Sequence, residues 1–405
     1  QQPMADKTRT GWTTVAFGDI AEPVNDRVDD PATAGVDRYV GLEHLDADSL
    51  TIRRWGSTED VSSTKLRFGP GDIIFGKRRV YQRKLAVADF HGICSAHALV
   101  LRAKPEAVLP EFLPYFMQSD YFMEAALKIS VGSLSPTINW KTLAQYEFNL
   151  PPVGYQKSLT ATLSAAAELR DRYKRVQHRL TLLKRAVFHA TLTGGEKSRA
   201  TRWGSCRGEI PIVRLGDVCS VKRGASPRPK GNPLYFSADP TPYHWIKISD
   251  LALFKVGAHL TSTTEFLTAA GAEKSRIVTP GSLLLTNCAT VGVPVFSAIQ
   301  GCIHDGYLVF DDFDDSVTDT YLYRLFEYLT PWFKATAQTG TQANLNTGIL
   351  QDLEVPLIAI ADQSRLADLL SALESMNLQA GQLSSQLGNL QNKFFMSSDP
   401  ARELS

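Results

Sequence analysis

Short apolar runs separated by Gly, Pro and Asp turn signals open the chain and recur in its second half. Runs of this kind predict strands. An amphipathic stretch follows them at residues 111–129 and again at 320–336, and each predicts a helix. The pattern therefore predicts one small α/β module used twice. The predicted strands are 39–42, 72–75, 84–88 and 98–102 in the first module and 245–248, 282–286, 293–298 and 307–310 in the second.

Each module leads into a long stretch whose apolar residues are spaced mostly in alternating steps of four and three, as in the seam of a coiled coil. We expect the two stretches to pair as antiparallel helices, because a module lies between them. The alternative is two amphipathic helices, each packed on its own module. At 1.5 Å per residue each seam spans roughly 45 to 50 Å, more than the ~34 Å turn of B-DNA. The predicted seam residues are Leu159, Leu163, Ala166, Leu169, Tyr173, Val176, Leu180, Leu183 and Val187, then Leu366, Leu370, Leu373, Met376, Ala380, Leu383, Leu387, Leu390 and Phe394.

An internal repeat supports this organisation. A shift of 207 residues places Asn139 on Asn346 and Gln156 on Gln363, and the same shift continues through the two long stretches. Upstream, Phe17-Gly-Asp-Ile20 corresponds to Leu215-Gly-Asp-Val218, and segment 70–74 corresponds to 280–284. Landmarks that recur in the same order indicate duplication rather than chance similarity. We therefore expect an α/β (α+β) tandem repeat with modules at 12–155 and 196–358 and spacer helices at 156–195 and 363–397.

Composition fits a folded protein of two domains. Of the 405 residues, 43% are hydrophobic and 21% are charged. No apolar run is long enough to cross a membrane and no signal sequence is evident, so we expect a cytoplasmic protein. The five cysteines and the histidines show no metal-ligand spacing, so we expect no metal site. The net charge is only +1, so any nucleic-acid surface has to come from local clusters of cations.

The densest cluster of cations follows the predicted strand 72–75. Arg and Lys bond phosphates and guanine edges, Gln bonds adenine, and a tyrosine ring adds a planar surface. We therefore predict DNA contacts from this loop, and a solvated hairpin tip is the alternative. The residues are Lys77, Arg78, Arg79, Tyr81, Gln82, Arg83 and Lys84.

The second module differs, because its corresponding loop at 286–292 is neutral and its cations lie elsewhere. The two modules should therefore read different sequences. Both modules also carry a polar loop before the aligned block, which we predict to contact DNA, although Asn139 and Asn346 are equally suited to cap the next helical turn. The candidates are Ser133, Ser135, Thr137 and Asn139 in the first module and Lys222, Arg223, Arg228, Lys230, Asn287, Thr341, Gln342, Asn344 and Asn346 in the second.

Two motifs approach catalytic signatures without matching them. Segment 71–77 has the glycine and lysine spacing of a phosphate-binding loop, but Arg78 stands where Mg²⁺ needs Ser or Thr. Segment 149–152 is similar to the Asn-Pro-Pro-aromatic motif of amino-methyltransferases, but Leu150 is inserted and no glycine-rich cofactor loop accompanies it. We therefore expect no catalytic residues in this chain.

The order of these parts resembles the DNA specificity subunits of Type I restriction-modification systems, from Trp12 to about Ser397. The resemblance rests on the Phe17-Gly-Asp-Ile20 opening, segment 70–74, the glycine-serine loop, the exit at Pro152 with Gln156, and segment 183–188 approaching Thr193-Gly194. It implies two target-recognition domains that each read half of a split site in double-stranded DNA, with the helices setting the gap. It also implies two methyltransferase subunits that methylate adenine with their own S-adenosylmethionine, and restriction subunits that join them. The competing hypothesis is a coiled-coil scaffold whose modules bind proteins.

Overall fold

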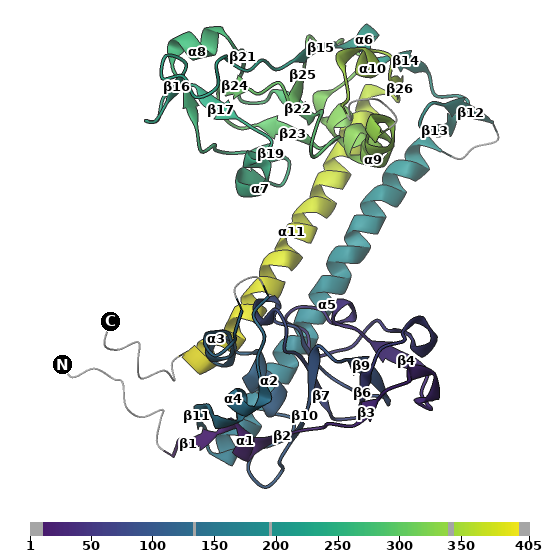
Figure 1. Ribbon diagram of the computed structural model, residues 1–405. Helices are drawn as coiled ribbons and strands as arrows, with labels where there is room; N and C mark the ends of the chain where they lie inside the picture. The colour runs from purple at the N-terminus through teal and green to yellow at the C-terminus, as the bar shows by residue number, and fades with distance from the viewer. Residues whose placement is uncertain (1–10, 133–134, 194–196, 339–343, 397–405) are drawn as a thin grey trace. The chain divides into compact units, whose positions relative to one another are not determined.

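A computed structural model describes residues 11–132, 135–193, 197–338 and 344–396. The chain divides into two compact units, Gln1–Lys174 with Gly381–Ser405 (unit 1) and Arg175–Ala380 (unit 2). Each unit contains an α/β module and part of two long helices, α5 (Val153–Leu192) and α11 (Ile360–Met396) (Figure 1). Among the described helices, none combines the length and the apolar character that a bilayer span requires.

The module of unit 1 is built on two small sheets and a terminal strand pair. One sheet has the order β2–β10–β7–β8 and is antiparallel throughout. The other has the order β3–β6–β9–β4–β5, in which β4 and β9 are parallel. The first strand pairs with the last, β1 with β11, and so closes the module. The strands are β1 (Thr13–Ala16), β2 (Ala21–Pro23), β3 (Arg27–Val28), β4 (Arg38–Val40), β5 (Gly56–Ser57), β6 (Lys65–Phe68), β7 (Ile73–Gly76), β8 (Leu85–Val87), β9 (Gly92–Ser95), β10 (Ala98–Ala103) and β11 (Glu147–Leu150).

An aromatic core joins these strands to short helices. Phe148 of β11 stacks on Phe122, with ring centroids 5.4 Å apart, and meets Phe116 edge-on at 5.3 Å. The predicted helix 111–129 is divided into α2 (Leu113–Gln118) and α3 (Asp120–Lys128). The division occurs because Ser119 has extended backbone angles and its side chain accepts a hydrogen bond from Phe122 N, which caps a new helix.

The module of unit 2 repeats this plan with longer sheets. The sheet orders are β15–β25–β22–β23–β19–β18 and β16–β20–β17–β24–β21, and β14 pairs with β26 as β1 does with β11. A hairpin, β12–β13, precedes them. The strands are β12 (Ser198–Thr201), β13 (Gly204–Arg207), β14 (Ile212–Arg214), β15 (Ser220–Arg223), β16 (Phe236–Ser237), β17 (His244–Ile246), β18 (Lys255–Val256), β19 (His259–Leu260), β20 (Phe266–Leu267), β21 (Arg276–Val278), β22 (Leu283–Thr286), β23 (Pro294–Ser297), β24 (Gly301–Ile303), β25 (Tyr307–Asp311) and β26 (Glu354–Pro356).

One continuous helix, α9 (Asp319–Gln338), forms the centre of the unit 2 core, as the apolar pattern at 320–336 predicts. It packs on the sheet through Tyr323, which stacks on Phe296 at 5.2 Å, and Phe326, which lies 4.8 Å from Phe310. Two short helices, α7 (Asp250–Phe254) and α8 (Ala269–Glu273), lie between the strands of this module along the chain.

The sequence repeat is also a structural repeat. A one-turn helix follows the first strand in each module, α1 (Phe17–Ile20) and α6 (Leu215–Val218), and another precedes the last strand, α4 (Trp140–Gln145) and α10 (Thr347–Gln351). The first of each pair packs closely on the second: a Cβ added at Gly18 would lie 3.1 Å from Ala144 O, and one at Gly216 would lie 3.2 Å from Gln351 Cβ. Glycine at both positions allows this approach.

Each long helix is anchored to its own module by an equivalent glutamine. Gln156 and Gln363 are 1% and 0% exposed, and each accepts one backbone N–H and donates to backbone carbonyls. A buried amide that is fully bonded in this way fixes the direction in which the helix leaves the module. The bonds join Gln156 to Leu109 N (3.0 Å) and Pro151 O (2.8 Å), and Gln363 to Thr318 N (2.9 Å), Ile358 O (3.0 Å) and Ser316 O (2.8 Å).

The long helices pair antiparallel, as predicted. In unit 2 the side-chain amide of Gln177 donates to Asn377 O at 3.4 Å, and Lys184 lies 3.7 Å from Glu374. The residue number rises along α5 as it falls along α11. In unit 1 a Cβ added at Gly388 would lie 3.6 Å from the guanidinium of Arg170, which fits the same antiparallel register. Figure 1 shows the two helices side by side.

From Leu169 onward, every second position of the predicted α5 seam is replaced in the buried face by the residue that follows it. Leu169, Val176 and Leu183 were expected in the seam, but they are 41%, 43% and 45% exposed. The neighbours that follow them, Arg170, Gln177 and Lys184, are shielded instead. The shift occurs because these polar side chains find partners, such as the Asp48 carbonyl that accepts from Arg170. Met376 and Leu383 of α11 are likewise 53% and 41% exposed, while Asn377 and Ser384 face inward.

Candidate nucleic-acid interface

The cation-rich segment of unit 1 is the loop that joins β7 to β8. Val80 is 2% exposed and anchors the loop to the core, which turns Arg78, Arg79 and Tyr81 outward. Arg79 and Arg83 adopt left-handed backbone angles, with φ of 58° and 52°. A left-handed conformation costs a residue with a side chain roughly 1–2 kcal/mol. Strain of this kind persists where the surrounding structure imposes it, and it concentrates at functional sites.

Residues 135–138 of the predicted polar loop lie directly against this cation-rich segment. Arg79 N donates to Pro136 O at 2.8 Å, and Ile138 N donates to Lys77 O at 2.9 Å. The guanidinium of Arg78 donates through Nε to the Ser135 hydroxyl at 2.9 Å. The structure thus joins two separately predicted elements into one surface. Ser133 lies outside the described residues.

Several predicted residues in this surface are engaged in internal contacts. Arg83 forms ion pairs with Asp48 at 2.6 Å and Asp120 at 2.7 Å. The ammonium of Lys84 donates to Leu42 O at 2.6 Å. These two cations therefore brace the loop, and Arg78 and Arg79 remain its exposed cations.

Thr137 and Asn139 are also turned to internal roles, and Lys77 is partly buried. Burial lowers the pKa of Lys77, and the positive charge of Arg27 lowers it further. The hydroxyl of Thr137 donates to Ser135 O at 3.1 Å. Asn139 caps α4, since its side chain accepts from Lys141 N at 3.0 Å. The capping alternative for Asn139 is the one that the structure adopts.

Beside the loop lies an open cavity of about 390 Å³. Arg78, Arg79 and Gln82 form one side of it, and residues from two other segments complete it. Sequence reasoning missed Glu43, Ser95 and His97, because single residues in unrelated segments give no local signal. The lining residues are Leu42, Glu43, Arg78, Arg79, Gln82, Lys84, Ser95 and His97.

Unit 2 holds the corresponding loop in the same backbone framework. Lys77 N donates to His97 O at 3.1 Å, and its equivalent Asn287 N donates to Gly306 O at 2.9 Å. The bond from Ile138 N to Lys77 O, 2.9 Å, recurs from Leu345 N to Asn287 O, also 2.9 Å. The described end of the polar loop, at Ile138 in one module and Leu345 in the other, therefore takes the same place in both.

The backbone conformation of the two loops also agrees. Ala289 has a φ of 54° and Gly292 a φ of 76°, at the positions equivalent to Arg79 and Arg83. A non-glycine residue in the left-handed region at the same place in both copies indicates that the framework imposes this turn. The side chains, however, differ: the two arginines of one module correspond to an alanine and a glycine in the other.

The cations of unit 2 gather on the turn after β24. Arg223 donates through Nε to Asp305 O at 2.8 Å, and Arg228 lies 3.9 Å from the Asp305 carboxylate. Burial lowers the pKa of His304; Asp305 opposes this, and Lys230, Arg228 and Arg223 lower it further. Arg223, Arg228 and Lys230 therefore share one surface with His304 and Asp305, which sequence reasoning did not select.

The other candidates of unit 2 lie around or apart from this turn. Asn287 is 1% exposed and its side chain donates to Asp305 O at 3.2 Å, so it supports the turn from within. Lys222 pairs with Asp311 at 3.4 Å and Asp312 at 3.3 Å, away from the cluster. Asn344 is partly exposed, and Asn346 caps α10 by accepting from Ile349 N at 2.9 Å. Thr341 and Gln342 lie outside the described residues.

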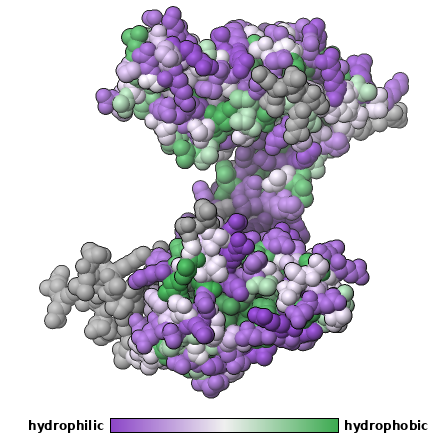
Figure 2. Space-filling model, viewed as in Figure 1, coloured by the Kyte–Doolittle hydropathy of each residue, from purple (hydrophilic) through white to green (hydrophobic). Residues whose placement is uncertain are grey.

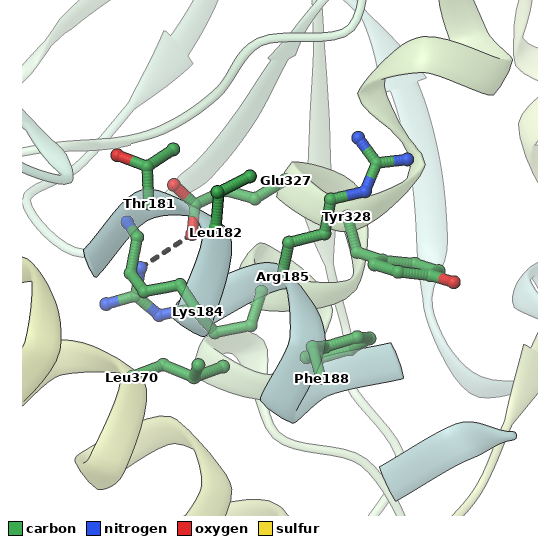
Figure 3. A pocket seen from close by; sticks show the side chains of 9 residues that line it. Thr181, Leu182, Lys184, Arg185, Phe188, Glu327, Tyr328 and Leu370 are labelled. Carbon is green, nitrogen blue, oxygen red and sulfur yellow. Dashed lines mark hydrogen bonds and ion pairs between the residues drawn. The ribbon is translucent and has the colours of Figure 1, made fainter. Parts of the chain in front are cut away.

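A second cavity, of about 320 Å³, lies in unit 2 where α5, α9 and α11 meet. Figure 3 shows Lys184, Arg185 and Phe188 of α5 opposite Glu327 and Tyr328 of α9. Arg324, which also lines the cavity, is 6% exposed and pairs with Glu327 at 2.6 Å and Glu374 at 2.5 Å. This buried network joins the long helices to the core of their module. Within the described residues, no three His, Cys, Asp or Glu side chains gather as metal ligands would.

Part of the chain matches a known protein family. Residues 209–387 match the family model described as the Type I restriction modification DNA specificity domain. The Type I restriction enzyme EcoDI specificity subunit of Escherichia coli is 31% identical over 155 residues, which are 36% of this chain and 33% of that protein. The match therefore spans about a third of the length of this curated relative.

Solved structures share the fold at lower identity. A chain from a structure of the type I R-M system, described for its complex assembly and conformational transition, is 20% identical and superimposes with a TM-score of 0.59 over 95% of this chain and 96% of its own. The Type-I restriction-modification system S subunit from M. genitalium is 13% identical, with a TM-score of 0.60 over 98% of both chains. The family model therefore assigns residues 209–387 to the Type I restriction modification DNA specificity domain, and the whole chain shares the fold of these solved structures.

Proposed function

We propose that this chain is the subunit that selects the DNA target of a Type I restriction-modification complex, and that its two modules are target-recognition domains for the halves of a bipartite site in double-stranded DNA. The observation that carries the proposal is the pair of equivalent loops, which share backbone bonds and left-handed turns but differ in side chains. A common framework with unlike side chains suits two readers of different sequences.

The same proposal assigns no catalytic step to this chain. Adenine methylation belongs to methyltransferase subunits that carry S-adenosylmethionine, and cleavage belongs to restriction subunits that join them. The contribution of this chain is to bind the duplex at a defined register while a partner extracts and modifies the base.

The exposed apolar residues of the long helices support docking of two identical partners. A subset of them recurs every seven residues, which places that subset along one stripe of each helix, while others such as Leu182 and Leu378 lie off the stripe. The internal shift of 207 residues carries the α5 stripe onto the α11 stripe. On the face seen in Figure 2, hydrophilic residues cover most of each unit, so a regular apolar stripe is unusual for this surface. The stripes are Leu169, Val176 and Leu183 of α5 and Leu369, Met376, Leu383 and Leu390 of α11, each between 40% and 53% exposed.

The test is DNA binding by the complex of this chain with its methyltransferase partner, measured by fluorescence anisotropy on random-sequence duplexes from 50 to 300 mM NaCl. We expect affinity to fall steeply with salt, because phosphate contacts release counterions. Replacing Arg78 and Arg79 with Ala should lower the log-log slope by about two, near 0.9 for each phosphate contact. The exposed lysines Lys128 and Lys141 serve as matched controls and should leave the slope unchanged.

The competing function is a scaffold whose modules bind proteins. It predicts an interaction with DNA that is undetectable, or insensitive to salt, in the presence of the methyltransferase partner. Equal losses in the arginine and lysine variants would instead keep DNA binding but reject the assignment of the β7–β8 loop.

A further inference from the structure

The cavity beside the β7–β8 loop contains a residue that does not suit general binding to DNA. Among the eight side chains that line it, Glu43 is the only carboxylate, and it shares the cavity with the exposed cations Arg78 and Arg79. A carboxylate repels phosphates and can only accept hydrogen bonds when it is ionised. On a surface that holds a duplex, such a group weakens binding unless it meets a donor.

The local fold keeps this carboxylate at the cavity. Glu43 belongs to the short turn Leu42–His44, which is held because Gly41 N donates to His44 Nδ1 at 3.0 Å. The side chain lies over Gly41 so closely that a Cβ there would clash with the carboxylate. Burial raises the pKa of Tyr39 on the adjacent β4, and the charge of Glu43 raises it further. The carboxylate therefore lies beside Gly41 and Tyr39 and shares the cavity with Ser95, while Glu43 stays exposed at the cavity mouth and accessible to a ligand.

The base edges of the major groove offer one kind of donor. Cytosine presents its N4 amino group and adenine its N6 amino group, while guanine and thymine present acceptors and a methyl group. Carboxylates read the amino groups, whereas Arg reads guanine and Gln reads adenine. The cavity thus combines an acceptor from Glu43 with donors from Arg78, Arg79 and Gln82 on a single concave surface.

We infer that Glu43 accepts a hydrogen bond from the exocyclic amino group of a base, and that it determines which base the first module requires at one position of its half-site. This inference rests on the proposed function, since it names what that same surface reads. It makes Glu43 a discriminating residue: it contributes little to affinity and excludes bases that present only acceptors at this position.

The experiment compares the wild type with Glu43→Ala and Glu43→Gln, each assembled with the methyltransferase partner, by selection from a duplex library randomised across the half-sites. We expect Glu43→Ala to lose a preference for cytosine or adenine at one position by about 5- to 150-fold, the range of a good base contact. Preferences at the other positions should persist, and affinity for random duplex should stay level or rise as the repulsion is removed. Glu43→Gln keeps an acceptor and should lose less of the preference.

The outcomes separate the inference from its premise. The exposed Glu106, outside the cavity, is the matched control, and Glu106→Ala should select the same sequences as the wild type. Unchanged preferences in Glu43→Ala, or a change in affinity that is uniform over all sequences, would overturn the role of Glu43. A wild-type complex that shows no preference at any position would instead refute the proposed function. Thermal melting of each variant checks that the module remains folded.

Discussion

Replacing Arg324 tests the buried network that joins the long helices to the module of unit 2. Its guanidinium bonds Glu327, Glu374 and the hydroxyl of Ser371, which lies 2.9 Å away on α11. In the variant Arg324→Met a similar volume fills the site, but the two carboxylates lose their shared cation. Glu374 keeps its ion pair with Lys184, at 3.7 Å, and the more distant charge of Lys255.

The expected loss follows from burial. Removing one partner of a buried ion pair costs about 3–5 kcal/mol, because the remaining charge stays desolvated. Glu374 is 18% exposed and Glu327 is 30% exposed, so partial hydration places this case near the lower limit, about 3 kcal/mol. For a unit of this size, 1 kcal/mol corresponds to roughly 2–4 °C, so the melting temperature of unit 2 should fall by about 6–12 °C.

The assay is thermal denaturation of the purified chain, monitored by circular dichroism and by calorimetry. The unfolding transitions of the two units are fitted separately. The double variant Arg324→Met with Glu374→Leu removes the desolvated charge together with its partner, and it should recover most of the loss. Arg365, which is 80% exposed and pairs only with Asp362 on its own helix, provides a control that should shift stability by less than about 0.5 kcal/mol. A loss below about 1 kcal/mol in Arg324→Met, or no recovery in the double variant, would refute the reasoning.

Three further predictions use the same structure. The pKa of Glu374 lies below its ordinary 4.5, because Arg324, Lys184 and Lys255 outweigh the opposing effect of burial. The stability that the ionised Glu374 contributes is therefore present above pH 4.5 and is lost as the pH falls further. Acid titration of the unfolding free energy should show a smaller loss in Arg324→Met than in the wild type. Gln363→Leu leaves Thr318 N and buried carbonyls unbonded and should cost unit 2 about 2–3 kcal/mol, and Gln156→Leu should affect the transition of unit 1 instead, which denaturation resolves. Burial and the nearby Asp305 raise the pKa of Cys288, so maleimide labelling should be slow at about pH 7.5. A cognate duplex should slow it further if the cation surface beside Asp305 binds DNA as proposed; labelling that ignores DNA would contradict that proposal.

The architecture could be predicted from sequence because it depends on regular spacing and on duplication. The tandem modules, the antiparallel helices and the strands at 72–75 and 282–286 all followed from periodic patterns and from the internal shift, and the structure confirms them. The division at Ser119 was missed, because a serine inside an apolar pattern signals a cap only when its backbone angles are known.

The helix seam was predicted one residue away at every second step for a related reason. A search for apolar residues finds Leu169, Val176 and Leu183, but shielding in the pair falls on polar neighbours, several of which bond to the opposite helix or to the module. Polar residues at seam positions lower stability and fix register. Only the tertiary partners distinguish such a residue from a solvated one.

The candidate sites show the same limit. Composition located the cation-rich loop of unit 1, and the structure then separated exposed Arg78 and Arg79 from Arg83 and Lys84, which brace the loop. Neither Glu43 nor Asp305 could be selected, because each becomes part of a site only when distant strands bring it beside the loop. The sequence shows the chemistry of a side chain, but whether that side chain is bonded internally or left exposed depends on partners far away along the chain.

The left-handed turns in the two equivalent loops do not depend on the side chains present. The β7–β8 loop is held by backbone bonds at Lys77 and the β22–β23 loop by backbone bonds at Asn287, and Arg79 and Ala289 adopt the same turn. The exposed side chains are therefore not needed to shape the loop. Arg79→Gly should test this separation, because it should stabilise unit 1 by about 1 kcal/mol through relief of the left-handed strain while it weakens DNA binding through loss of the cation. A variant that lost stability and binding together would mean that the Arg79 side chain also builds the loop, and the two modules would then have less freedom to diverge.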